Sequence, residues 1–363
     1  MLKLRLGVVT QVDPLRVRVG TEERGAWADE GLVGEVRESD EVIVNTEALD
    51  LGLGSGGFDV VHVNLTRGLD APAAEAATAM KLNYSSLQHP VEPVEVRSGR
   101  VDSARDSGWD EDEAEVRRIP VLVLSLHGQL APAAWAAHRA GAELRVGYVQ
   151  TSGGALPGSL SEDVAELRRT RLLCGHVTAG PAYGGELEAV TVIGALQAAT
   201  GPLGWDAAIA GPGPGMIGSA SELGHGGMAA LDTAHASLIL GLETLVAPRM
   251  SSADPRPRHR GLSHHTATVL RMLLGNVRVP GPATATSPWP RISGGDGAID
   301  ELREACGDRH ELWLRDAPAD EYAASGLPMA HMGRGLSQDP LFFASALASG
   351  DALAAAALTE LVS

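Results

Sequence analysis

Apolar residues at every second position predict several short β-strands in the first hundred residues. The alternation covers residues 4–8, 15–19 and 42–44, with turns at Asp13-Pro14 and Gly20. Residues 58–63 predict a further strand, and residues 80–96 predict one or two more. Short strands at this spacing are typical of a small barrel or sandwich. We therefore expect a β-rich domain over residues 1–98.

An acidic stretch follows this domain. Asp and Glu crowd residues 102–115, and few apolar residues accompany them. A segment of this composition cannot bury enough apolar surface to pack as a core. We expect residues 99–118 to form a solvated acidic linker.

Apolar runs of strand length alternate with helix-length segments from Ile119 to the end of the chain. The predicted strands cover residues 120–126, 144–149, 172–177, 206–210, 242–247 and 311–314. The predicted helices cover residues 132–140, 162–169, 186–200, 228–240, 263–274, 299–306 and 342–361, with the last interrupted at Gly350. A capping box at Ser159–Glu162 opens the second helix, and Ser263 is the expected N-cap of the fifth.

Strands that are apolar throughout and separated by helices indicate a mostly parallel sheet covered on both faces. We expect a three-layer α/β ligand-binding domain over residues 119–363. A closed barrel of such units is the alternative, but five or six units favour an open sheet. Glycines and prolines predict a flexible loop at residues 281–297.

Charge and composition narrow the possible partners. The chain of 363 residues carries 29 Lys+Arg and 46 Asp+Glu, a net charge of −17. Phosphates would be repelled, so we expect no nucleic-acid partner. A hydrophobic fraction of 44% is ordinary for a folded protein and excludes wholesale disorder. No clean run of ~20 apolar residues predicts a membrane span, and we expect no membrane partner.

Cysteine usage and the N-terminus bear on the compartment. Cys174 and Cys306 are too few for a disulfide scaffold, and the first residues lack the apolar core of a signal peptide. We therefore expect a cytoplasmic protein. A homodimer is the commonest oligomer and our default expectation.

Glycines and chemically active side chains follow the predicted strands, at the edge where parallel sheets bind ligands. Gly153 and Gly154 follow one strand, and Gly213, Gly215 and Gly218 follow another. The second group fits G-x-G-x-x-G, whose backbone amides can approach an anion closely. A tight structural turn explains the same glycines. A dinucleotide site is less consistent with them, because the motif does not follow the first strand.

The densest cluster of charge is residues 249–265, which we name the arginine–histidine segment. It packs four arginines and three histidines into 17 residues and adjoins a predicted helix N-terminus. Cations there oppose the helix dipole, and a bound anion would relieve that conflict. We expect Arg256, Arg258 and Ser263 to bind the anion. Structural ion pairs are the alternative.

A metal site is a second alternative for this segment. Asp254, His259 and His265 supply suitable donor atoms and are its weak candidates. Adjacent His264 and His265 point about 100° apart on an ideal helix, which argues against one ion binding both. No metal-specific spacing such as H-E-x-x-H occurs, so we expect no metal site.

Four residues are candidates for acid–base catalysis. His127, His259 and His264 have the side chain that titrates nearest neutral pH. Glu186 is the best carboxylate for proton transfer, although an acidic residue at a helix start is more commonly a cap. Nucleophilic hydrolysis is unsupported, because no G-x-S-x-G elbow occurs.

Five blocks of the chain resemble the bacterial domain of unknown function 3866 family. They are Thr46 to Gly57, Ser152 to Pro157, Gly184 to Val190, Gly211 to Gly218 and Ser252 to His265. The stretch from Asp254 to His265 is the most specific of them. The resemblance covers almost the whole chain and implies a shared fold and site, but no reaction.

These observations lead to one preferred function and two alternatives. We expect the chain to bind a small anionic, phosphorylated ligand at the carboxyl edge of its sheet, with histidines available for acid–base work. A non-catalytic regulatory or assembly protein is the first alternative. A metal-dependent hydrolase is the second. The sequence indicates no particular cofactor and does not decide whether the protein is an enzyme.

Overall fold

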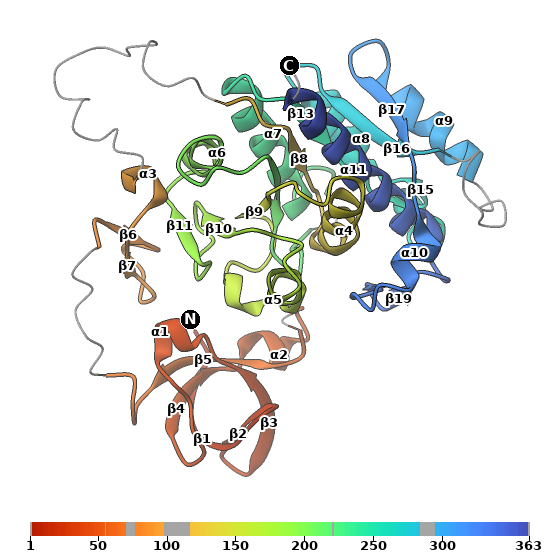
Figure 1. The fold of residues 1–363 in the computed structure, drawn as a ribbon. Helices are drawn as coiled ribbons and strands as arrows, with labels where there is room; N and C mark the ends of the chain where they lie inside the picture. The colour runs from red at the N-terminus through yellow and green to blue at the C-terminus, as the bar shows by residue number, and fades with distance from the viewer. Residues whose placement is uncertain are drawn as a thin grey trace. The chain divides into compact units, whose positions relative to one another are not determined.

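The protein is seen in a computed structural model that describes residues 2–54, 56–69, 77–97, 117–219, 221–283 and 295–361 (Figure 1). The chain divides into two compact units, Met1–Glu92 and Pro93–Ser363. Most of the predicted acidic linker lies outside the described residues, as do residues 284–294 of the predicted loop.

The first unit contains a closed five-stranded barrel, which confirms the predicted β-rich fold. Its strands are β1 (Leu4–Val12), β2 (Leu15–Val19), β3 (Glu22–Trp27), β4 (Glu41–Asn45) and β5 (Asp59–Asn64), in the order β1-β2-β3-β5-β4. Alternate residues point inward, so small valines such as Val17, Val42 and Val44 fill the core. The unit also contains α1 (Glu30–Val33), α2 (Glu47–Leu51) and the hairpin of β6 (Ala79–Lys81) and β7 (His89–Val91).

The second unit is built on an open parallel sheet, as predicted, although the sheet has eight strands and the sequence predicted six. The strands are β8 (Val121–Val123), β9 (Val146–Thr151), β10 (His176–Ala179), β11 (Leu187–Ala189), β12 (Ala207–Pro212), β13 (Thr244–Val246), β16 (Arg278–Pro282) and β17 (Glu311–Arg315). Their order is β11-β10-β9-β12-β8-β13-β16-β17. The chain first runs outward from β8 through β9 to β11, then returns to insert β12 between β9 and β8. The direction of winding therefore changes at the centre of the sheet, where ligands bind in open parallel sheets.

Helices cover both faces of this sheet. One face packs against α4 (Leu130–Ala140), α5 (Glu162–Arg169), α10 (Ala319–Ala323) and α11 (Pro340–Glu360). The other packs against α3 (Val94–Arg97), α6 (Val192–Thr200), α7 (Ala229–Ile239), α8 (His264–Met272) and α9 (Gly295–Cys306). Successive strand residues point to opposite faces, so Leu122 belongs to the first core, and Val121 and Val123 to the second.

Helix α11 runs unbroken through Gly350, so the predicted interruption there is wrong. A Cβ atom on Gly350 would overlap the carbonyl oxygen of Ala133 in α4. The missing side chain lets the two helix backbones approach closely, which favours a continuous helix. Helix α11 is long enough to cross a membrane, and its most apolar 18 residues have a mean hydropathy of 1.6. However, 89% of this stretch is buried inside the structure. It is a core helix of the second unit.

Two further predictions at the ends of elements are wrong. Residues 187–189 form the edge strand β11 and not the start of a helix, because they pair with β10; Thr191 then caps α6. Residues 281 and 282, which the sequence predicted to begin a loop, are the end of β16 (Arg278–Pro282). The prolines in this strand had suggested a loop. These prolines are tolerated because β16 pairs with β13 only at Arg278. The loop was also predicted to extend to residue 297, but α9 begins at Gly295.

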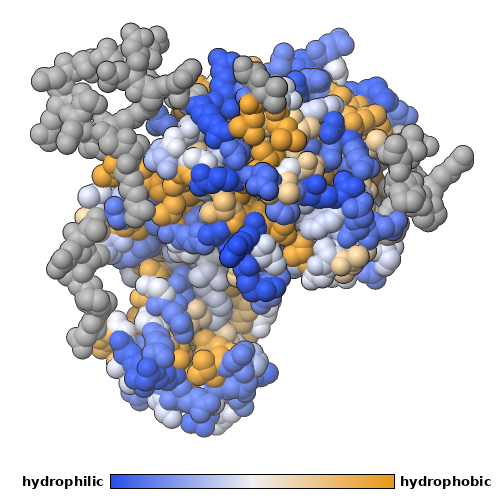
Figure 2. Space-filling view, in the orientation of Figure 1, coloured by the Kyte–Doolittle hydropathy of each residue, from blue (hydrophilic) through white to orange (hydrophobic). Residues whose placement is uncertain are grey.

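Hydrophilic side chains cover much of the visible surface, with apolar patches between them (Figure 2). The aromatic content is only 4%, so the buried layers depend on small and branched side chains. Alanines line both faces of the sheet and the facing side of α11. Close helix approach therefore contributes much of the packing in this unit.

We predict that Gly350→Ala destabilises the protein by about 1–3 kcal/mol, because the added methyl group forces α11 away from α4. The same substitution at Gly297 in α9 is the matched control. A Cβ atom there meets no atom of the described residues within 4 Å, so Gly297→Ala should stabilise the helix by about 0.5–1 kcal/mol. Denaturant unfolding at pH 7 measures both. Equal effects at the two positions would contradict this account of α11.

Candidate functional site

The loops after β9 and β12 pack closely against each other at the carboxyl edge of the sheet. A Cβ atom on Gly226 would overlap the carbonyl oxygen of Gly153, and one on Gly154 would overlap that of Gly213. Gly153 has a φ of +106°, which residues with a side chain rarely adopt. Backbone therefore packs directly on backbone, and the structure brings these glycines together.

The glycine turn from Gly213 to Gly218 directs the chain back to a histidine. Gly218 and His225 form a β-bridge, and the Gly226 amide donates to the Ile217 carbonyl. Gly215, at the tip, is exposed and has a φ of +67°. The predicted motif is thus a tight turn that also fixes the position of His225.

The arginine–histidine segment folds over the same edge, after β13. Its ends pair as the short strands β14 (Met250–Ser251) and β15 (Gly261–Leu262). Ser263 then caps α8 as predicted, accepting a hydrogen bond from the His265 amide at 3.3 Å. Its hydroxyl also lies 2.7 Å from His259 Nδ1, and the residue is fully buried. Ser263 is therefore occupied by structural contacts.

Asp254 is the centre of the segment. Its carboxylate is completely buried and accepts hydrogen bonds from Arg249 Nη2 at 3.1 Å and from Arg256 Nε and Nη2 at 2.9 Å each. Arg334 Nη2 lies 3.6 Å from it and also bonds Asp339 at 3.1 Å through Nε. These five charges form one network, in which the predicted metal candidate Asp254 is occupied by arginines.

Burial and charge act on this network in opposite directions. Burial alone would raise the pKa of Asp254, but the hydrogen bonds and charges of Arg256 and Arg249 outweigh it and hold the pKa well below its usual range. Burial lowers the pKa of Arg249 to about 10. Both groups are therefore charged at neutral pH.

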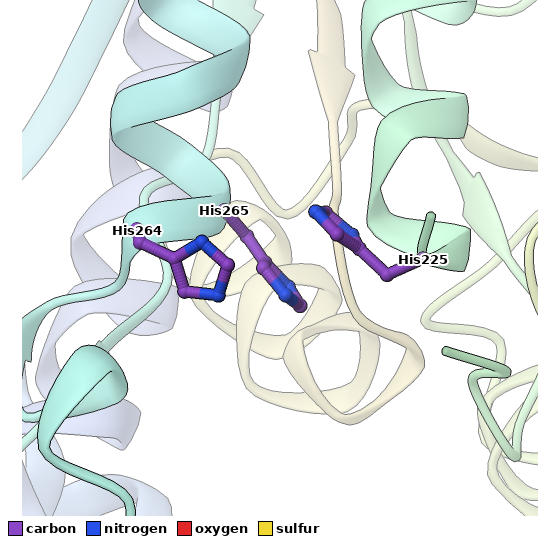
Figure 3. Close-up of side chains that lie close together, drawn as sticks. All are labelled: His225, His264 and His265. Atoms are coloured by element: carbon purple, nitrogen blue, oxygen red, sulfur yellow. The ribbon is translucent and has the colours of Figure 1, made fainter. Parts of the chain in front are cut away.

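Three histidines converge beside the network. His264 and His265 begin α8, and His225 approaches them from the loop before α7 (Figure 3). One ring nitrogen from each lies within 4.8 Å of the others. The sequence argued against one ion binding both His264 and His265, yet in the first turn of α8 both rings face His225 (Figure 3).

The histidine rings also contact one another. The rings of His225 and His265 stack with their centroids 3.5 Å apart. The ring centroid of His259 lies 4.7 Å from that of His265 and 4.9 Å from that of His264. Burial is the largest effect on all four, and it lowers the pKa of His259 to about 3 and of His265 to about 2. Burial also lowers the pKa values of His225 and His264. All four imidazoles are neutral at pH 7.

The two predicted anion-binding arginines differ in their partners. Arg256 is bound twice to Asp254, as described above. Arg258 is exposed and donates only a long hydrogen bond, 3.4 Å, to His259 Nε2. Within the part of the chain that the structure describes, Arg258 forms no ion pair with a carboxylate.

His127 lies in a different group of side chains. It is buried, with Nδ1 3.1 Å from the Pro212 carbonyl and Nε2 2.7 Å from Ser161 Oγ. Ser161 also caps α5 by accepting from the Val164 amide. Burial lowers the pKa of His127. These contacts join the loop after β12 to α5, so His127 has a clear structural role.

Glu186 is not at the edge with the histidines. Its carboxylate is partly exposed and pairs with Arg168 at 2.6 Å. It precedes the edge strand β11 and not a helix, so neither the predicted helix start nor a cap applies. No contact of Glu186 joins it to the loops after β12 or β13 among the described residues.

Three residues of the site were not among the predicted ones: His225, Arg334 and Asp339. His225 had a signal, because it stands between glycines in a loop after a strand. Arg334 and Asp339 had none. Arg334 lies in β19 (Arg334–Gly335), which forms a tiny hairpin with β18 (Ala330–His331), and Asp339 follows that hairpin; the sequence there shows no periodic pattern.

A hollow of about 610 Å³ lies at the opposite edge of the sheet, at the amino ends of β13, β16 and β17. Three of its charged residues pair with one another: Arg278 bonds Glu311 at 2.9 Å and also Glu243. The histidines and the arginine–histidine segment are at the other edge.

Comparison with known families adds one finding. The family model for DUF3866, a protein of unknown function, matches residues 26–350. The chain belongs to the DUF3866 family. This confirms the resemblance carried by the arginine–histidine segment and the glycine loops. No curated protein and no solved structure matches this DUF3866 chain.

We predict that Asp254→Asn destabilises this DUF3866 protein by about 3–5 kcal/mol at pH 7, because it leaves the buried Arg249 without its counter-charge. Asp300→Asn is the control, since Asp300 is exposed and pairs with the exposed Arg303; little change is expected there. Denaturant unfolding is the measurement.

The same pair of variants has a pH signature. Because the folded pKa of Asp254 is depressed, its contribution is full above the unfolded pKa of about 4 and is lost as the pH falls further. The difference in stability between wild type and Asp254→Asn should therefore shrink between pH 5 and pH 2. A difference that stays constant with pH would contradict the role of the charge.

Proposed function

We propose that this protein binds a small anionic, phosphorylated ligand at the carboxyl edge of its parallel sheet. The support is a local surplus of positive charge. Five arginines, Arg249, Arg256, Arg258, Arg260 and Arg334, gather around two carboxylates, Asp254 and Asp339. In a chain with a net charge of −17, this local reversal of sign favours an anion.

Arg258 carries the proposal. Its guanidinium is exposed beside the histidines, and unlike Arg256 it has no carboxylate partner among the described residues. An unpaired guanidinium can bind a phosphate through two parallel hydrogen bonds. Arg256 then acts chiefly through Asp254, by keeping the segment folded, and adds only its charge to the anion site.

The glycine turn supplies a second source of donors. Its tip at Gly215 is exposed, and the amide groups of Gly215 and Met216 donate to no other group in the described parts of the chain. Backbone amides of such a turn can receive an anion without the entropy cost of ordering long side chains. The turn and Arg258 are linked through His225 and the other histidines.

The neutral histidines decide which group would move a proton. His259 and His264 lie nearest to Arg258, and both have lowered pKa values because of burial. A neutral imidazole can accept a proton from a bound ligand but cannot donate one. A reaction at this site would therefore begin with a base, and His264 is the candidate, because Arg258 and Ser263 occupy the two ring nitrogens of His259. The cytoplasmic location and the homodimer stay predictions.

Binding is tested with metal-stripped full-length protein. Calorimetry and thermal shift would measure phosphate, sulfate, ribonucleotides and sugar phosphates at low salt. Arg258→Ala should weaken the best anion by about 10-fold or more, since hydrogen bonds to charged groups contribute about 1.5–3 kcal/mol. Arg258→Lys should bind the anion with an affinity between those of the wild type and Arg258→Ala, because lysine keeps the charge and loses the bidentate geometry.

Arg303→Ala is the matched control, because Arg303 is an exposed arginine of α9 with only a local partner. It should bind as the wild type does. An absence of binding by every anion class would contradict the proposal, and so would equal binding by Arg258→Ala and Arg303→Ala. A stoichiometric protein partner captured without any anion response would favour the regulatory or assembly alternative.

A further inference from the structure

We propose that His225, His264 and His265 together bind one divalent transition-metal ion of the zinc class. The three side chains come from two segments, the loop after β12 and the first turn of α8 (Figure 3). One nitrogen from each already lies within 4.8 Å of the others. Around a tetrahedral ion with bonds of about 2.0–2.1 Å, nitrogen ligands lie about 3.4 Å apart. The nitrogens must approach one another, and at least one ring must reorient, to reach that spacing.

Two of the nitrogens have no partner in the described structure. His225 Nδ1 and His264 Nε2 are both buried and make no hydrogen bond. Only 9% of His225 is exposed, so a water molecule does not easily reach Nδ1 to replace the missing hydrogen bond. A buried acceptor without a partner destabilises the folded state. A metal ion would remove that cost at both atoms.

A backbone contact sets the orientation of His225. Its Nε2 lies 2.9 Å from the Glu222 carbonyl, which accepts the ring proton at that position. The lone pair is therefore on Nδ1, the atom that lacks a partner. Metal-binding histidines commonly have this arrangement, with one nitrogen donating to a carbonyl and the other free for the ion.

Gly227 leaves space beside the nitrogens. A Cβ atom there would lie 3.0 Å from His225 Nδ1 and 3.2 Å from His265 Nδ1. Any side chain at this position would crowd the two atoms that must approach an ion.

Binding must overcome two existing contacts. The rings of His225 and His265 are stacked almost parallel, 8° apart, and an ion lies in the plane of each ring that binds it. One ring must therefore tilt. His265 Nδ1 also has a long contact with Arg249 Nη1, 3.4 Å. Arg249 keeps its shorter bond to Asp254 after that contact opens, so the loss is small.

The donor set selects the kind of ion. Three nitrogen ligands and no carboxylate suit zinc, cobalt, nickel or copper and not magnesium or calcium. His259 is excluded from the set because Ser263 and Arg258 occupy its two nitrogens. Three protein ligands leave a fourth position open, which is typical of catalytic and not of structural zinc sites.

Cobalt(II) titration tests this on full-length protein that has been dialysed against a chelator. In buffer free of phosphate and other strong anions, one equivalent of cobalt should bind and give visible absorption bands typical of four- or five-coordinate cobalt. Zinc should displace it. His225→Ala and His264→Ala should each weaken cobalt binding at least tenfold. Removing a group that only hydrogen-bonds a metal ligand already weakens binding by about 10-fold or more, and removing a ligand itself should cost no less.

Two further variants sharpen the result. Gly227→Ala keeps all three imidazoles and fills the space beside them, so it should also weaken cobalt binding. His138→Ala is the control, because His138 lies in the last turn of α4, at the other edge of the sheet, and should bind cobalt as the wild type does. Circular dichroism checks that each variant folds. His264 is only partly buried, so its variant decides the test if His225→Ala fails to fold.

The proposal is overturned if the wild type gives no cobalt bands, or if His264→Ala binds cobalt as tightly as His138→Ala does. The metal titration contains no anionic ligand, and the anion measurements contain no metal. The two proposals can therefore fail separately.

Discussion

The buried carboxylate of Asp254 is the interaction on which the candidate site depends. Arg249, Arg256 and Arg334 come from two separate loops, and without a counter-charge they would repel one another at the sheet edge. Asp254 neutralises part of this charge in a position that water cannot reach. The arginine–histidine segment can therefore fold tightly over β13 while it still leaves Arg258 exposed for other contacts.

The order of the strands determines which loops meet above this network. Because β12 inserts between β9 and β8, the loop that carries His225 emerges between neighbours that are distant in sequence. Direct packing of Gly226 on Gly153 then holds that loop against the one after β9. The outcome is a group of histidines supported on one side by glycine backbone and on the other by an ion-pair network.

Anion binding and metal binding are compatible chemistries at this edge. A metal ion held by three histidines has an open position, and a cationic guanidinium beside it would attract a ligand with negative charge. The neutral state of the histidines favours metal binding, since it removes repulsion of a cation, but a histidine that binds the ion through its lone pair could not also act as a base. The hydrophobic layers contribute rigidity: α11 packs so closely on α4 that the strands below have little freedom to shift.

The sequence alone determined the elements and the local chemistry. Short apolar patterns identified every barrel strand except β3, apolar runs separated by helices identified every strand of the parallel sheet except β11 and β16, and Ser263 marked the start of α8. The arginine–histidine segment was recognisable because its charge contrasts with that of the chain. Errors occurred where tertiary contacts override local preference, as at Gly350, whose missing side chain serves close helix packing. Only the tertiary structure decided that His225 meets His264 and His265, and that Arg334 and Asp339 join Asp254. Those contacts follow from the strand order, and no local periodicity encodes which strands become neighbours.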